Sequence, residues 1–328
     1  MARVVVTGGS GFIGSHLVDG LIARGDEVVV LGPRGAPEFP SPLWKEAEYV
    51  RGSVTSRADL ERAITPDVDV VYHLAALVGV DKYLASPLKV IDVNFVGTGN
   101  VVDRSLEVGA KVIYASTSEV FGKNAKAPWG EDADRVLGST AADQWVYSSS
   151  KALAEHLLFG YAKERGLRAS IVRYFNLYGP RQRPAFLISR SIHRALRGEP
   201  PVLYGQGDQR RSFTFVEDAV KATLLIASSP EAEGECFNVG NSEEVSIRET
   251  VELIVELTGT VDEISSVDAG SRSGASHQGL DRPVPDTERI RSLLGWKSSV
   301  ALRDGVERTV RWVRENPRWL DRPEGASR

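Results

Sequence analysis

Three glycines at three-residue spacing, Gly8, Gly11 and Gly14, stand between an apolar run over residues 2–7 and an amphipathic stretch. The run predicts a buried strand, and the stretch predicts a helix that Gly25 ends. In such a strand–turn–helix unit, the glycines permit a tight turn, a close approach of the backbone to a pyrophosphate, and packing of helix on strand. Free N–H groups at the helix start then face the phosphates. The pattern predicts a dinucleotide site; the alternative is an ordinary turn with flexible glycines.

Strand and helix patterns alternate over the first 180 residues. After the glycine motif, strands are expected over 28–31, 48–50, 68–72, 111–115 and 168–173, and helices over 58–64, 88–108 and 152–165. This rhythm predicts an α/β fold, a Rossmann-type doubly wound parallel sheet with helices on both faces. Because ligands of such sheets lie at the carboxyl ends of the strands, the residues just after each strand are the first candidates for a site.

After about residue 180 the rhythm breaks, and proline, glycine and arginine become frequent. Short helices are expected over 185–197, 216–228, 246–258, 287–294 and 302–315. We therefore expect a dinucleotide-binding domain over 1–180, to which later segments return, and a smaller C-terminal α/β substrate-binding domain over 181–320. The sequence predicts a loop over residues 270–279 and a frayed tail over residues 321–328.

The composition narrows the class of protein. Of 328 residues, 42% are hydrophobic and 26% are charged, and the net charge of −4 comes from interspersed signs, which argues against a surface dedicated to nucleic acid. The single cysteine, Cys236, excludes an internal disulfide framework and a cysteine-based metal cage, and we expect no metal site. No apolar run reaches the roughly 18 residues of a membrane span, and the N-terminus has a strand pattern, so we expect a cytoplasmic enzyme.

Two further motifs carry groups suited to proton transfer. Tyr147 and Lys151 lie one turn apart on one face of a predicted helix. A nearby ammonium favours phenolate, so we expect Lys151 to lower the pKa of Tyr147 and make it a general base. Thr117, Ser118 and Glu119 follow a predicted strand, where hydroxyls can bond a sugar oxygen. The alternative for Tyr147 and Lys151 is a pair on the protein surface. The alternative for Thr117, Ser118 and Glu119 is a turn that caps the next segment.

Together, these motifs resemble the extended short-chain dehydrogenase/reductase family. Further similar pieces lie at residues 73–76, 94–98, 173–181, 208–218, 237–240 and 293–296. The resemblance spans about residues 2–315. Its combined motifs are specific to family members that modify nucleotide sugars, which are 4-epimerases, 4,6-dehydratases and UDP-glucuronate decarboxylases.

The resemblance implies a nicotinamide cofactor that is kept between two half-reactions. Tyr147 would deprotonate the sugar 4-hydroxyl while hydride passes from C4 to the nicotinamide. Lys151 would bond the nicotinamide ribose, and Thr117 would bond the same sugar oxygen as Tyr147. The resulting 4-ketone acidifies the C5 hydrogen or labilises a carboxylate on C5.

The resemblance also implies the residues that bind cofactor and substrate. Those for the cofactor are Gly8, Gly11, Phe12, Ile13, Gly14, Leu74, Ala75, Ala76, Asn94, Tyr147, Lys151 and Tyr174, with Arg34 and Ser53 at the adenosine end. Those for the nucleotide-diphosphate sugar are Ser118, Asn176, Arg211 and Arg282. An arginine suits a diphosphate because its planar fork meets two oxygens at once. Without the resemblance, the better interpretation is a strand-edge amide for Asn176 and solvated surface charges for Arg211 and Arg282.

Glu119 bears on the type of reaction. Simple 4-epimerases carry a small or hydroxyl residue at this place, so an acid there resembles the dehydratases and decarboxylases, in which it works near C5. The stretches 78–83, 136–147 and 282–287 look most like the branch that contains the UDP-glucuronate decarboxylases. A scaffold role for Glu119 leaves a simple 4-epimerase as the alternative, and a non-catalytic dinucleotide sensor is a remote one.

The chain departs from the family pattern at the cofactor's adenosine end. Members that use NAD place an acid at the end of the second strand, on the ribose 2′-hydroxyl. Here that position is Gly32, and Arg34 follows closely, while Ser53 takes a second position that is usually acidic. Losing the carboxylate removes repulsion against a 2′-phosphate, which Arg34 could bind. We expect NAD, with NADP as the alternative.

The predicted helices over 88–108 and 152–165 carry apolar residues on more than one face. Members of the family typically dimerise by packing these two helices into a four-helix bundle. The resemblance therefore implies a homodimer.

Overall fold

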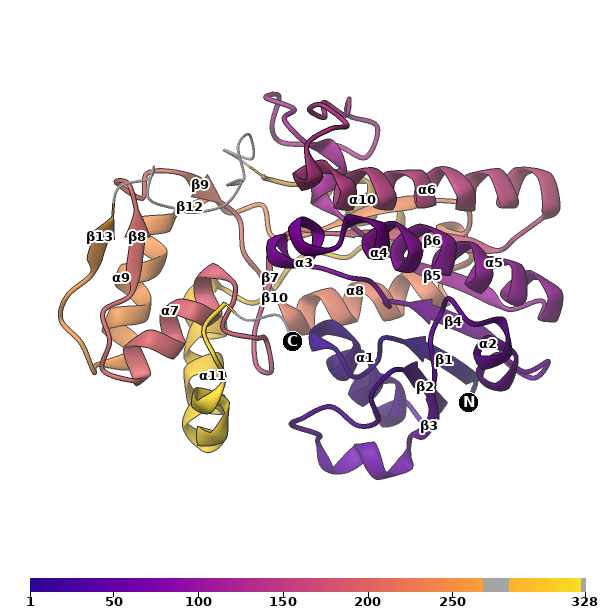
Figure 1. Ribbon diagram of the computed structural model, residues 1–328, viewed down its shortest axis with the longest axis horizontal. Helices are drawn as coiled ribbons and strands as arrows, with labels where there is room; N and C mark the ends of the chain where they lie inside the picture. Colours follow the sequence, from indigo (N-terminus) through magenta and orange to yellow (C-terminus); the bar gives the residue numbers. More distant parts are fainter. Residues whose placement is uncertain (268–282, 326–328) are drawn as a thin grey trace.

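The computed structural model describes residues 1–267 and 283–325 (Figure 1). At its centre is a seven-stranded sheet with the order β11-β6-β5-β4-β1-β2-β3, and every pairing in it is parallel. Its strands are β1 (Arg3–Thr7), β2 (Glu27–Gly32), β3 (Glu48–Arg51), β4 (Val70–His73), β5 (Lys111–Thr117), β6 (Ala169–Tyr174) and β11 (Cys236–Val239). The predicted doubly wound α/β fold is confirmed.

Helices cover both faces of this sheet because its strands are apolar on both sides. In β1, Val4 and Val6 face one hydrophobic cluster and Val5 faces the other. One layer consists of α1 (Phe12–Ala23), α8 (Val216–Ser228) and α10 (Glu288–Leu294), and the opposite layer of α2 (Arg57–Ala63), α5 (Gly97–Val108) and α6 (Val146–Arg165). Since α8, β11 and α10 come late in the chain, the C-terminal half returns to the main sheet.

The helix predicted over 88–108 is formed by consecutive helical segments. α3 (Val80–Ala85) precedes α4 (Pro87–Ile91), and a π-helical turn joins α4 to α5. This turn buries Asn94 completely. α6 begins at Val146, earlier than the predicted residue 152, so the Tyr–Lys motif lies in its first turns.

The remaining elements form a smaller lobe, on the left in Figure 1. They are β7 (Leu177–Tyr178), α7 (Leu187–Leu196), β8 (Val202–Tyr204), β9 (Arg210–Arg211), β10 (Thr214–Phe215), β12 (Val245–Ser246), α9 (Ile247–Thr258), β13 (Ser265–Val267) and α11 (Leu302–Glu315). The lobe has its own core, in which Tyr178, Phe213, Ile254 and Val310 are buried together. Within the described ranges, no helix is both long and apolar enough to cross a membrane.

The C-terminal residues are more ordered than the sequence predicts. Trp319 is buried, and Arg322 forms an ion pair with Glu38 at 2.5 Å. Since Glu38 follows β2, this contact ties the small lobe to the main sheet. The expectation of a frayed tail is therefore wrong for residues 322–325. The predicted loop at 270–279 lies outside the described residues.

Candidate active site

The glycine motif forms a tight turn between β1 and α1. Gly8 has a φ of 71°, and a Cβ placed on it would lie 2.8 Å from the backbone nitrogen of Ala75. A Cβ on Gly14 would lie 2.5 Å from the carbonyl oxygen of Gly8, so turn and helix approach this closely only because both residues lack side chains. Gly11 caps α1 without a side chain, and half-buried Phe12 and Ile13 follow. The turn and the helix start therefore fit the phosphates of a dinucleotide.

The loop after β4 lies against this turn. The N–H groups of Leu74 and Ala75 donate to the carbonyl and hydroxyl oxygens of Thr7, at 3.1 and 3.2 Å. Asn94 accepts from the N–H of Leu77 at 2.7 Å and donates to its carbonyl at 3.2 Å. Both ends of the Asn94 amide thus bind the loop backbone, which positions the loop beside the glycine turn.

The four residues expected to be catalytic meet at the carboxyl end of β5. Thr117 ends β5, accepts a hydrogen bond from the N–H of Glu119 at 3.2 Å, and its hydroxyl also hydrogen-bonds the phenol of Tyr147. Tyr147 and Lys151, from the first turns of α6, are 5% and 2% exposed. The structure therefore brings together two elements that are separate in sequence, as the family resemblance implies.

The ammonium of Lys151 is directed at the backbone of β5. It donates to the carbonyl of Ala115 at 2.7 Å, and it lies 4.5 Å from the ring centroid of Tyr114. Burial lowers the pKa of Lys151 to about 7. Burial and the charge of Glu119 raise the pKa of Tyr147 above its usual value. The net pKa of the phenol is therefore raised and not lowered as the sequence predicted, because burial and the charge of Glu119 dominate at the phenol.

Glu119 lies beside Tyr147, and the pKa of its carboxyl group is also shifted from the usual value. Burial raises the pKa of its carboxyl group to about 7, against the opposing charge of Arg211. Near neutral pH this carboxyl therefore exists in both its protonated and its ionised form. A group with such a pKa can both give and take a proton.

The expected substrate-binding residues lie where the small lobe joins the sheet. Asn176 follows β6 with a φ of 41°, and its amide donates to the carbonyl of Ser212 at 3.0 Å. This bond ties the end of β6 to the strand β9 that carries Arg211. Ser118 is buried beside Thr117. Arg282 lies outside the described residues.

Two residues expected at the cofactor also form hydrogen bonds within the protein. The hydroxyl of Tyr174 is 2.7 Å from that of Thr223 in α8. Ser53 contacts the hydroxyl of Thr55 at 2.8 Å and donates its N–H to Asp59 at 2.9 Å. These contacts hold the chain just after β3 and at the end of β6, and the cofactor role of both residues stays a prediction.

The adenosine end holds cations that the sequence did not single out. Arg34 is exposed after β2, and Lys82 from α3 and Arg183 from the small lobe are half-buried. Burial lowers the pKa of both Lys82 and Arg183, and the charge of Arg34 lowers both further. Sequence reasoning missed these two residues because nothing local brings α3 and the small lobe to the end of β2.

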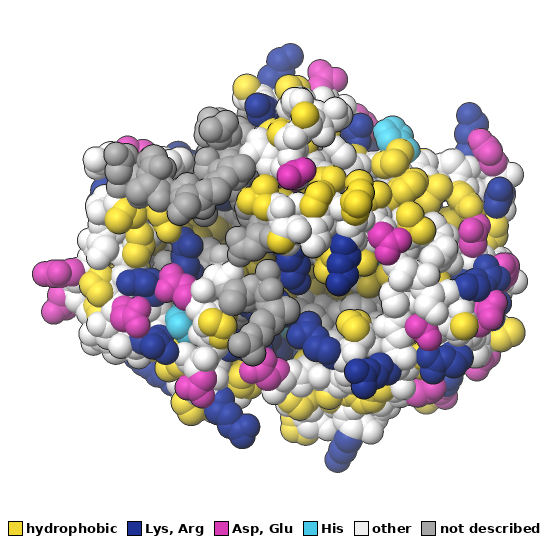
Figure 2. All heavy atoms as spheres, viewed as in Figure 1, with side chains coloured by type: hydrophobic (Ala, Val, Ile, Leu, Met, Phe, Trp, Pro, Cys, Tyr) yellow, Lys and Arg dark blue, Asp and Glu magenta, His cyan; other side chains and the backbone are white. Residues whose placement is uncertain are grey.

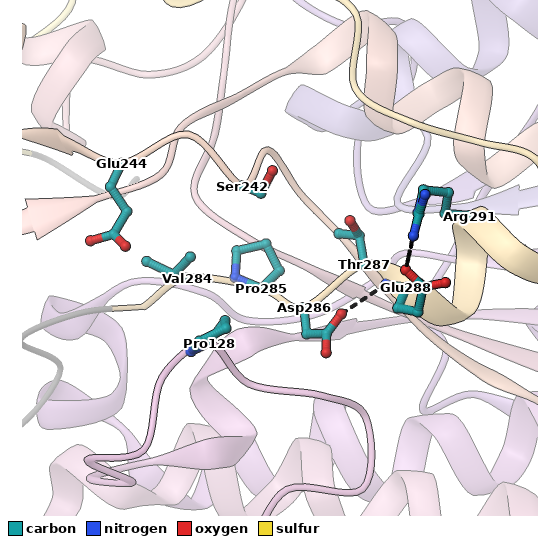
Figure 3. A pocket seen from close by; sticks show the side chains of 9 residues that line it. All are labelled: Pro128, Ser242, Glu244, Val284, Pro285, Asp286, Thr287, Glu288 and Arg291. Carbon is teal, nitrogen blue, oxygen red and sulfur yellow. Dashed lines mark hydrogen bonds and ion pairs between the residues drawn. The ribbon is translucent and has the colours of Figure 1, made fainter.

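A separate cavity of about 370 Å³ opens beside the segment before α10 (Figure 3). Beside this cavity, Asp286 accepts a hydrogen bond from the N–H of Glu288 at 2.8 Å, and Glu288 forms an ion pair with Arg291. Its lining residues are Pro128, Ser242, Glu244, Val284, Pro285, Asp286, Thr287, Glu288 and Arg291. None of the four expected catalytic residues lines this cavity, so it is distinct from the reacting centre.

The glycine turn, the buried Tyr–Lys pair and the β5 residues define an enzyme of the extended short-chain dehydrogenase/reductase class. A family model described as the NAD dependent epimerase/dehydratase family matches residues 4–240. This chain belongs to that family.

The similarity to known relatives and solved structures extends over nearly the whole of this chain. A UDP-N-acetyl-alpha-D-glucosaminuronate decarboxylase of Bacillus cytotoxicus is 36% identical over 318 residues, which are 95% of this chain and 98% of the relative. A UDP-glucose 4-epimerase of Thermotoga maritima, solved with UDP-glucose, has a TM-score of 0.86 at 29% identity and covers 96% of this chain and 99% of its own. MoeE5, solved with UDP-glucuronic acid and NAD, has a TM-score of 0.83 at 33% identity with the same coverage. The protein is an enzyme that modifies a nucleotide sugar through transient oxidation at C4 by a retained nicotinamide cofactor.

Proposed function

We propose that this enzyme decarboxylates a UDP-linked hexuronic acid. The observation that carries the proposal is Glu119, a carboxyl group with a pKa of about 7 beside the general base Tyr147. A protonated acid at this place suits a reaction that must protonate C5. The similarity to the Bacillus cytotoxicus decarboxylase and to the structure that holds UDP-glucuronic acid supports the same choice.

The reaction begins at the sugar 4-hydroxyl. Tyr147 takes the hydroxyl proton, and Thr117, already hydrogen-bonded to the phenol, binds the same oxygen. A nicotinamide held at the glycine turn would supply the hydride acceptor for C4. To accept the hydroxyl proton, the phenol of Tyr147 must first be ionised, and the charge of the Lys151 ammonium favours this phenolate form.

Loss of carbon dioxide follows from the ketone at C4. A carboxylate on C5 is β to that ketone, so the electrons of the bond between C5 and the carboxylate carbon move into a C4–C5 enolate as carbon dioxide leaves. Glu119 then donates its proton to C5. When hydride returns to C4, Tyr147 gives the proton back to the 4-oxygen, and each residue regains its starting form after Glu119 is reprotonated from solvent.

A simple 4-epimerase is the second candidate, and the Thermotoga maritima epimerase favours it. In that reaction Glu119 is structural, as its backbone bond to Thr117 allows. Incubation with UDP-glucuronic acid and UDP-glucose in deuterated water separates the two. Carbon dioxide release with deuterium at C5 supports decarboxylation, whereas inversion at C4 without label would overturn it.

We propose NAD as the dinucleotide, as in the MoeE5 structure. The cluster of Arg34, Lys82 and Arg183, together with Gly32 at the end of β2, favours NADP as the alternative, because these cations suit a 2′-phosphate. Denaturing the purified enzyme and weighing the released cofactor decides between them, and recovered NADP would reject NAD.

We propose a homodimer with a four-helix-bundle interface, which includes α4 and α6. Apolar side chains are exposed on both helices: Leu88 is 80% exposed, Leu153 is 50% and Phe159 is 40%. Figure 2 shows hydrophobic side chains gathered over this part of the surface. Apolar patches of this kind mark contact sites for other molecules. A cytoplasmic location stays a prediction from the sequence.

A further inference from the structure

A charged network lies buried beneath the reacting centre. Glu155 is 4% exposed, and its partners Ser116 and Arg173 are 4% and 7% exposed. The hydroxyl of Ser116 donates to Oε1 of Glu155 at 2.5 Å. Arg173 donates to both carboxylate oxygens, at 3.0 and 2.6 Å. The carboxylate is thus held by three hydrogen bonds from two strands, a geometry in which a buried ion pair is well compensated.

This network joins the three elements that carry the site. Ser116 immediately precedes Thr117 at the end of β5, and Arg173 lies near the end of β6. Glu155 lies one helical turn after Lys151 on α6, on the same face of the helix. β5 and β6 are neighbours in the sheet, and α6 packs in the layer over them (Figure 1). A single carboxylate therefore fixes the helix of the Tyr–Lys pair against the strand of Thr117.

The charges around Lys151 show a second effect of Glu155. Burial lowers the pKa of Lys151, and the charge of Glu155 is the influence that raises it. From β4, His73 faces Lys151 but is neutral near pH 7, because burial lowers its pKa to about 3. From β5, Tyr114 presents its ring. Among these described groups, Glu155 supplies the negative charge that favours the ammonium form of Lys151.

The groups that face Glu155 itself come from other elements. Arg173 carries the compensating charge, and its guanidinium also donates to the carbonyl of Glu131 at 2.7 Å and lies over the ring of Phe121. Cys236 on β11 lies close by, and burial raises the pKa of its thiol, so it carries no charge near neutral pH. Arg173 therefore binds both carboxylate oxygens of Glu155 within the core.

We propose that Glu155 is a positioning residue that acts through Lys151: it keeps the lysine charged and holds α6 against the end of β5. The inference rests on the proposed use of Tyr147 and Lys151 in proton transfer, and it assigns Glu155 no contact with the substrate. Loss of the carboxylate charge lowers the pH at which the Lys151 ammonium gives up its proton. Because the proposed reaction needs that ammonium, turnover should be lost at the same lower pH.

The test is the pH dependence of turnover in Glu155→Gln, measured on the holoenzyme with the nucleotide sugar that the wild type converts. We expect the alkaline limb of kcat to move about one pH unit lower, as for loss of a nearby opposite charge. KM for the sugar should stay within about two-fold, because only interactions with the bound substrate change KM alone. A limb that coincides with that of the wild type overturns the proposal.

Two further variants separate the charge from the packing. Ser116→Ala removes one hydrogen bond and keeps both charges, so its limb should stay at the wild-type pH; an equal shift there would overturn the electrostatic role. Glu155→Gln leaves a buried guanidinium unpaired, so Glu155→Gln/Arg173→Met provides a version without that charge. It should show the same lowered limb.

If the wild type converts no nucleotide sugar, the proposed function fails, whereas an active wild type with an unshifted Glu155→Gln limb rejects only this inference.

Discussion

The reacting centre and the adenosine end of the predicted cofactor site are built differently. At the reacting centre, Tyr147 and Lys151 are almost wholly buried, and burial moves the pKa of both from their usual values. At the adenosine end, Arg34 is exposed and Gly32 offers no side chain. In the proposed function, the chemical step therefore depends on groups held by the core, whereas the choice of dinucleotide depends on a few surface charges.

The largest effect is expected at the reacting centre. Tyr147→Phe removes the proton acceptor for the sugar 4-hydroxyl and keeps the ring's packing. Turnover should fall by about 10² to 10⁴-fold, the range for loss of a general acid–base group. The measurement is kcat for the converted nucleotide sugar, with unchanged melting temperature as the control for folding. Unchanged turnover would remove Tyr147 from the mechanism and restore the dinucleotide-sensor alternative.

Glu119→Gln sharpens the assignment of the reaction. The amide keeps the shape of the side chain but cannot give up a proton, so decarboxylation should fall by roughly 10²-fold. Product analysis by mass spectrometry checks whether the oxidised 4-keto sugar accumulates instead. A variant that turns over like the wild type would favour the 4-epimerase reaction, in which this residue is structural.

The pH profile tests the same two buried groups together. Both working forms are protonated, the carboxylic acid of Glu119 and the ammonium of Lys151, and both pKa values are about 7. Turnover should therefore fall as the pH rises through about 7. In Glu119→Gln one of the two titrations is gone, so the remaining fall should be less steep. Equal steepness in both proteins would contradict a working proton on Glu119.

A smaller effect is expected at the adenosine end. Arg34→Ala should lower the affinity for NADP relative to NAD by about ten-fold, because a charged hydrogen bond to the 2′-phosphate is lost. Titration of cofactor-free enzyme with both dinucleotides measures the ratio. Arg51→Ala, at the end of the neighbouring strand, is the matched control and should leave it unchanged. An Arg34→Ala ratio equal to that of the wild type would remove Arg34 from cofactor choice.

The smallest effect on turnover is expected at the outer surface of α4. Leu88→Glu places a charge at the proposed interface, where its burial is costly. The mass in size-exclusion light scattering should change from a dimer to the 35.7 kDa chain, with turnover of the residual enzyme within about two-fold. Leu293→Glu on α10 is an equally simple change at an exposed leucine and should stay dimeric. A wild-type mass of one chain would reject the dimer.

The sequence by itself determined the fold and singled out the residues that we propose to react. Gly8 and Gly14 are recognisable in the sequence because only glycine fits the close backbone contacts of this turn. Tyr147 and Lys151 are readable because helical spacing places them on one face. Such local signals survive in a single sequence because the geometry they require is local.

Only the tertiary structure decided how these residues behave. The high pKa of Tyr147, the low pKa of Lys151 and the near-neutral pKa of Glu119 all arise from burial between strands and helices far apart in the chain. The link from Ser116 and Arg173 to Glu155 joins residues from three elements, as does the meeting of Lys82 and Arg183 near Arg34. Desolvation and charge depend on every neighbour in space, and a pattern along the chain does not contain that information.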